Sequence, residues 1–145
     1  MSRTFDGVDD TLTLASESPL DFERTNTFSV AAWVKPNVTR SGGEVGYVIL
    51  SKLDNAAPNR GWECTVHWNG NASSETNIKI FLISTFSSNY ITALGSTDLQ
   101  NGTWYHLAWT YSGSSTVAGV TFYVNGVADT KTNTNDTLTA TMLNN

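Results

Sequence analysis

Aromatic and polar side chains alternate with apolar ones along three segments of the sequence: 28–36, 103–111 and 120–127. Where the apolar residues of a strand face a core, the residues between them face away from it. Trp33, His106, Tyr123 and Asn125 all fall in such outward positions. Aromatic rings stack on the C–H faces of sugar rings, and amide groups hydrogen-bond to sugar hydroxyls. The spacing therefore predicts a carbohydrate-binding surface made by these four side chains.

The same residues have a second interpretation, in which a terminal segment covers this face of the sheet. Trp33 and Tyr123 would then form a second layer of core, and His106 would be a structural histidine rather than an acid–base group. The two interpretations differ in whether the face that carries the Trp33 indole is open.

The other residue types that carry chemistry form no further recognisable site. His67 and His106 are not next to a strained nucleophile turn, and no Gly-rich loop precedes a helix. These two histidines and the one cysteine are too far apart to indicate zinc. Cys64 occupies an apolar row, so we expect a small buried hydrophobic side chain rather than a reactive thiol. Glu63, His67 and Asn69 share the opposite row, which predicts a strand face in contact with water.

Length and charge narrow the function classes. The chain has 145 residues, enough for one domain over residues 1–145, and a net charge of −5 with only 8 Lys and Arg. Binding of nucleic acid rests on clustered basic residues, so we do not expect it. No apolar run reaches the roughly 18 residues of a membrane span, and no signal peptide is visible. We expect no membrane insertion, and a location outside a cell, on its surface or in a virion, otherwise in the cytoplasm.

Short segments that suit strands alternate with turns containing Gly, Asn or Pro, and no segment shows helical periodicity. Asn125-Gly126 is a strong hairpin signal, because both residues tolerate positive φ. Besides the three segments above, the predicted strands are one within 4–14 that follows an Asp6-Gly7 turn, 47–52, 61–69, 77–84, 89–95, 127–130 and a short one within 138–143. The pattern predicts an all-β fold, a two-sheet antiparallel β-sandwich.

Four blocks of the sequence share their order and spacing with one known family: Phe5-Asp6-Gly7, 28–34, 104–106 and 123–126. In these blocks the chain resembles laminin-G-like domains of the concanavalin A-like type. The resemblance implies a jelly roll. Members of that family usually end in a further strand with a Phe-x-Gly-x-Ile-Asp-Glu-like pattern, which this sequence lacks. The resemblance therefore predicts a chain truncated at its C-terminus, or self-association with a partner chain at an open sheet edge.

The resemblance also implies a calcium ion at the rim of the sandwich. Calcium prefers carboxylate, amide and carbonyl oxygens. Asp54 and Asn55 follow the predicted strand 47–52, and Asp129 and Asp136 lie near the C-terminal hairpin. The alternative is that these side chains are solvated or form Asx turns.

Glycoside hydrolases also occur in this fold, and they need two carboxylates about 5–10 Å apart. The acids Glu17, Asp21 and Glu23 cluster in a predicted loop, and the predicted strands 28–36, 103–111 and 120–127 carry no carboxylate pair. We therefore expect no enzyme activity and a carbohydrate-binding or adhesion module that recognises a glycan or cell-surface polysaccharide. Alternatives are a structural, decoration or fibre protein of a virion or other large assembly and, third, a glycoside hydrolase.

Overall fold

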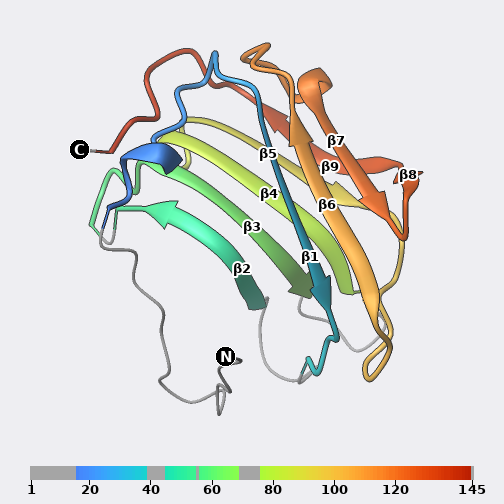
Figure 1. Ribbon diagram of the computed structural model, residues 1–145. Helices are drawn as coiled ribbons and strands as arrows, with labels where there is room; N and C mark the ends of the chain where they lie inside the picture. The colour runs from blue at the N-terminus through green and yellow to red at the C-terminus, as the bar shows by residue number, and fades with distance from the viewer. Residues whose placement is uncertain (1–15, 39–44, 55, 69–75, 145) are drawn as a thin grey trace.

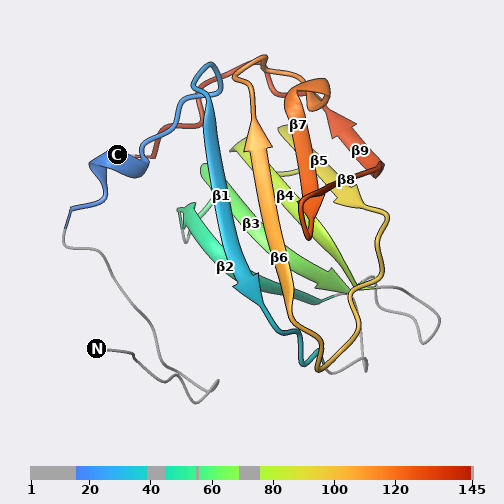
Figure 2. The ribbon, with the colours of Figure 1, turned by 45° about the vertical axis from the view of Figure 1, so that its right-hand side comes forward.

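Two antiparallel sheets pack face to face in the computed structural model (Figures 1 and 2), which describes residues 16–38, 45–54, 56–68 and 76–144. The four-stranded sheet has the order β1 (Phe28–Val34), β6 (Tyr105–Tyr111), β7 (Val120–Val124) and β8 (Val127–Asp129). The five-stranded sheet has the order β2 (Val45–Leu53), β3 (Gly61–Trp68), β4 (Thr76–Thr85), β5 (Asn89–Gly95) and β9 (Lys131–Asp136). The predicted all-β sandwich is confirmed.

Helical structure is confined to two single 3₁₀ turns in the described part of the chain, η1 (Ser18–Leu20) and η2 (Val117–Gly119). Within those residues, no helix is long and apolar enough to cross a membrane.

The apolar rows of the four-stranded sheet face the core, as the alternation predicts. Phe28 and Val30 of β1 are buried, while Ala32 and Val34 are half-buried near the end of the strand. The inward rows of β6 and β7 are buried as well: Leu107, Trp109, Tyr111, Val120, Phe122 and Val124. Since β1 pairs with β6 so that Val30 lies opposite Trp109, the residues between these rows face outward.

The five-stranded sheet supplies the other half of the core. Trp62, Cys64, Val66 and Trp68 form the inward row of β3, and all are almost completely buried. Burial raises the pKa of the Cys64 thiol far above its usual range, so the side chain stays a neutral, small hydrophobic group. This confirms the interpretation of Cys64 as a packing residue.

The predicted strand within 138–143 is wrong, because the last strand of the described chain is β9 in the polar stretch before it. β9 pairs with β5, with Thr132 opposite Leu94. In the segment that follows, Leu138 and Met142 still reach the core. Its backbone, however, is held by side chains instead of a ladder: the amides of Thr139 and Ala140 donate to the Asn89 carboxamide.

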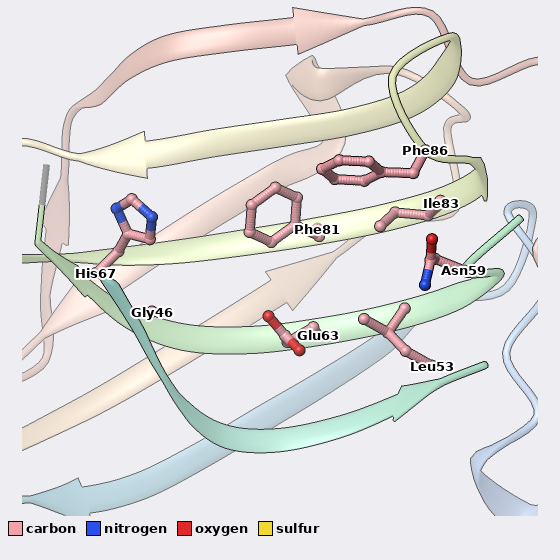
Figure 3. A pocket seen from close by; sticks show the side chains of 8 residues that line it. All are labelled: Gly46, Leu53, Asn59, Glu63, His67, Phe81, Ile83 and Phe86. Carbon is pink, nitrogen blue, oxygen red and sulfur yellow. The ribbon is translucent and has the colours of Figure 1, made fainter. Parts of the chain in front are cut away.

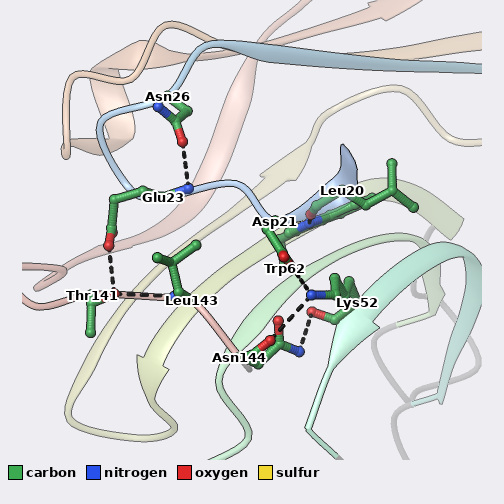
Figure 4. A network of polar contacts seen from close by, with 9 residues as sticks. All are labelled: Leu20, Asp21, Glu23, Asn26, Lys52, Trp62, Thr141, Leu143 and Asn144. Carbon is green, nitrogen blue, oxygen red and sulfur yellow. Dashed lines mark hydrogen bonds and ion pairs between the residues drawn. The ribbon is translucent and has the colours of Figure 1, made fainter. Parts of the chain in front are cut away.

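Side chains also fasten this C-terminal segment to the loop before β1 (Figure 4). The Glu23 carboxylate accepts hydrogen bonds from the Thr141 hydroxyl and the Met142 amide. The Lys52 ammonium pairs with Asp21 and donates to the backbone carbonyl of Asn144 at 3.2 Å. These contacts close one end of the sandwich. Self-association at a sheet edge stays a prediction.

Candidate functional site

The pairing of β1 with β6 brings three of the four predicted carbohydrate-binding residues together. Trp33 lies opposite His106, and their ring centroids are 5.4 Å apart in an edge-to-face arrangement. In the turn between β7 and β8, the Asn125 carboxamide accepts a hydrogen bond from the His106 amide at 2.9 Å. Tyr123 is half-buried and lies opposite Ala108, so it is beside this group and does not line it.

Trp104, just before β6, completes the surface. The side chains of Trp33 and Trp104 are 67% and 59% exposed. With His106, Asn125 and Gly126 they line a hollow of about 570 Å³ on the outer side of the four-stranded sheet. Within the described residues the face is open around Trp33, and none of them covers it as the second-layer interpretation requires; residues 1–15 lie outside the described part of the chain. We call this surface the tryptophan platform. The alternation placed Trp104 on the same face, but the predicted set did not include it.

Two of the predicted calcium ligands, Asp129 and Asp136, accept hydrogen bonds from the protein itself. Asp129 ends β8, and its carboxylate accepts four hydrogen bonds from the amides and hydroxyls of Ser96 and Thr97. The Asp136 carboxylate accepts a hydrogen bond from the Val117 amide. Asp54 lies between β2 and β3, and Asn55 is outside the described residues. No cluster of three or more metal-ligating side chains occurs among the described residues. Calcium stays a prediction.

A second hollow surface lies on the outer face of the five-stranded sheet (Figure 3). Two adjoining hollows of about 390 and 370 Å³ share His67, Phe81 and Phe86. Together they form one groove that crosses β2 to β5. We call it the sheet groove, and its described lining residues are Gly46, Leu53, Asn59, Glu63, His67, Lys79, Phe81, Ile83, Phe86, Tyr90 and Thr92.

Three aromatic rings form one side of the sheet groove. The ring centroid of Phe86 lies 6.5 Å from that of Phe81 and 6.0 Å from that of Tyr90. Phe86 lies in the turn between β4 and β5, and its side chain is 52% exposed. Its amide donates to the Pro58 carbonyl at 3.0 Å, so the turn is fixed against the loop that precedes β3. The backbone that carries the exposed ring is therefore held in place.

Charged and polar groups lie among the aromatic rings and opposite them. The Lys79 ammonium is 3.2 Å from Nε2 of His67 and lies 4.7 Å from the centroid of the Phe81 ring. Burial raises the pKa of Glu63, and a hydrogen bond from Ser51 and the charge of Lys79 offset this only in part. The groove thus combines a partly desolvated carboxylate with a fixed cation.

His67 corrects one sequence-based expectation. The row that contains Glu63 and His67 was expected to face water, but His67 is only 5% exposed. Gly46 on β2 and Lys79 on β4 lie against its ring. Asn69, the third member of that row, lies outside the described residues.

Two glutamates with opposite pKa shifts give a prediction about stability. Burial disfavours the ionised form of Glu63, so its destabilising contribution is present at neutral pH and disappears as the pH falls through its raised folded-state pKa. We therefore expect Glu63→Gln to raise the melting temperature at about pH 7 and to have less effect at about pH 4.

Glu23 is the matched control. Partial burial raises the pKa of its carboxyl, but hydrogen bonds from Thr141, Arg24 and Met142 outweigh this and leave it lowered. Its stabilising contribution is present above the unfolded-state pKa and is lost as the pH falls through the lowered one. Glu23→Gln should therefore lower the melting temperature at about pH 7. If both substitutions shifted the melting temperature at about pH 7 in the same direction, the opposite pKa shifts given to Glu63 and Glu23 would be contradicted.

Comparison with known proteins places the fold in a family. A family model described as the concanavalin A-like lectin/glucanases superfamily matches residues 6–144. Searches of curated proteins and of solved structures gave no match. The matched range contains both the tryptophan platform and the sheet groove, and it includes all but Phe5 of the blocks on which the resemblance was recognised. The chain belongs to the concanavalin A-like lectin/glucanases superfamily.

Proposed function

We propose that the protein is a non-enzymatic carbohydrate-binding module and that the sheet groove is its principal glycan site. The observation that carries this proposal is the half-exposed ring of Phe86 between Phe81 and Tyr90, opposite polar groups in a continuous groove. Such pairing of an aromatic side with a polar side suits a sugar, which has an apolar C–H face and a rim of hydroxyls. Membership of a superfamily that includes lectins supports the same conclusion.

The polar groups of the groove offer both donors and acceptors. The Lys79 ammonium can donate to sugar oxygens, and the Glu63 carboxylate can accept from hydroxyls. The backbone of Asn59 adopts the left-handed conformation with φ of 58°, and its side-chain amide nitrogen donates a hydrogen bond to the Asp54 carbonyl at 3.3 Å. Its carboxamide is therefore held at one end of the groove. Groups fixed in this way lose little freedom when a ligand binds.

The groove favours binding over hydrolysis. Cleavage of a glycosidic bond by the usual mechanism needs two carboxyl groups flanking the bond. Glu63 is the one carboxylate among the described residues that line the groove. A raised pKa would suit a general acid, but no second carboxylate among the described lining residues is present to work with it as nucleophile or base.

The proposal is tested by replacing Phe86 with alanine. We expect affinity for a groove-binding oligosaccharide, first identified on a glycan array, to fall about tenfold because the stacking surface is lost. Isothermal titration calorimetry measures the change. Val127→Ala is the control, since Val127 is 70% exposed on β8 and lines neither surface. Unchanged affinity in Phe86→Ala, or no binding across the array, would contradict the proposal.

A further inference from the structure

We propose that the tryptophan platform is a second, independent site for a neutral glycan, so that one domain binds sugar on both of its outer faces. The nature of the ligand rests on the proposed function, whereas the existence of a second site rests on the geometry of Trp33 and Trp104. The platform and the sheet groove belong to different sheets.

The two platform indoles differ from the other tryptophans of the chain. Trp62, Trp68 and Trp109 are at most 1% exposed, whereas Trp33 and Trp104 are mostly exposed. A single exposed apolar side chain on a protein surface is ordinary, but two large rings around one hollow form a patch of the kind that marks binding sites. The hollow of about 570 Å³ also falls within the usual size of small-ligand sites.

The polar groups of the platform are fixed in position. The side chain of Asn125 accepts a hydrogen bond from the His106 amide, and the backbone N–H of Asn125 donates one to the His106 carbonyl at 2.8 Å. Asn125 also has a positive φ of 53°, as the tight turn before Gly126 requires. Within the described residues its side-chain nitrogen makes no hydrogen bond. A fixed amide donor thus lies beside two exposed rings, which is the combination that a sugar hydroxyl and its neighbouring C–H face require.

Charge limits the ligand to a neutral one. The described lining of the platform contains no carboxylate and no ammonium group, whereas the sheet groove contains Glu63 and Lys79. The chain as a whole carries a net charge of −5, so an acidic polysaccharide is repelled at long range without a local cation in the hollow to compensate. The platform therefore suits a neutral sugar chain.

The arrangement of the sheets has a functional consequence. The sheets form the two layers of the sandwich, and their outer faces point in opposite directions (Figures 1 and 2). Sites on these two faces cannot engage one short oligosaccharide together. They can, however, hold two separate chains, so a single domain would cross-link a polysaccharide without forming a dimer.

The test uses the full chain with soluble laminarin and cello-oligosaccharides as neutral probes. Calorimetry gives the stoichiometry with short oligosaccharides, and turbidity gives cross-linking of the polysaccharide. We expect two binding events for the unmodified protein. Trp33→Ala with Trp104→Ala should remove one event and abolish cross-linking, whereas Trp33→Phe with Trp104→Phe should retain both. Both residues are exposed, and unchanged urea midpoints check that the variants still fold.

The outcomes separate this inference from the proposed function. If Trp33→Ala with Trp104→Ala keeps both the stoichiometry and the cross-linking, the second site is overturned. Self-association without sugar that these two substitutions abolish would also overturn it, since the platform would then bind a second copy. If Phe86→Ala has no effect while the platform variant loses all binding, the platform is supported and the groove proposal fails.

Discussion

Replacing Trp109 by alanine should lower the free energy of unfolding by about 3–5 kcal/mol, as is usual for removal of a large buried aromatic side chain. Trp109 is completely buried at the centre of β6. Its indole N–H crosses the core and donates to the Lys79 carbonyl on β4 at 2.9 Å. The residue thus fills the space between the sheets and also bonds one to the other. A total stability of about 5–15 kcal/mol leaves little margin for this loss.

A matched pair of substitutions separates packing from the hydrogen bond. Trp68 is as deeply buried as Trp109, but its indole nitrogen has no hydrogen-bond partner among the described residues. Trp109→Phe and Trp68→Phe remove the same atoms, yet only the first leaves a carbonyl without its donor. We expect Trp109→Phe to be more destabilising by about 1 kcal/mol or more.

Urea denaturation of the three variants measures these differences. Equal losses in the two Trp→Phe variants would show that the bond from Trp109 to Lys79 contributes nothing. Since the side chain of Lys79 lines the sheet groove, Trp109→Phe should also weaken oligosaccharide binding if that bond positions the groove.

The sequence predicts the central strands well because their pattern is set by burial on one face. The predicted strand 89–95 matches β5 residue for residue, and the expected core row of β6 is buried without exception. β9 was missed for the opposite reason. It lies at one side of the described five-stranded sheet, and its described side chains are exposed or half-buried, so its identity rests on backbone pairing with β5. Backbone pairing does not require apolar residues at alternate positions, so it cannot be recognised in the sequence.

The candidate sites also divide into one that a burial pattern predicts and one that depends on contacts distant in sequence. Trp33 and His106 were predicted together because they come from strands that alternate clearly, and β1 pairs with β6 in the register that joins them. Asn125 was predicted with them from the hairpin turn that follows β7. The sheet groove was not predicted. Phe86 belongs to a turn, and its position depends on contact with the Pro58 carbonyl, a partner far away in sequence. Likewise, the burial of His67 depends on Lys79 in the neighbouring strand.

The second large effect concerns the ion pair that fastens the C-terminal segment. Lys52→Met should lower the free energy of unfolding by about 3 kcal/mol, because removal of one partner leaves a desolvated charge uncompensated. The Lys52 side chain is 7% exposed and that of Asp21 28%. The same substitution removes the donor to the Asn144 carbonyl. Leu138 and Met142 of the C-terminal segment are buried in the core. If the segment loosens, their burial is reduced and the free energy of unfolding falls further.

A double-mutant cycle with Asp21→Leu decides whether the pair is coupled as its burial implies. We expect Lys52→Met combined with Asp21→Leu to recover most of the stability, since two charges are then replaced by apolar side chains together. The coupling energy should exceed about 1 kcal/mol and change little with added salt. A coupling below about 0.5 kcal/mol that salt abolishes would mean that the pair behaves like an exposed one. The hydrogen bonds from Thr141 and Met142 to Glu23 would then hold the C-terminal segment without help from Lys52.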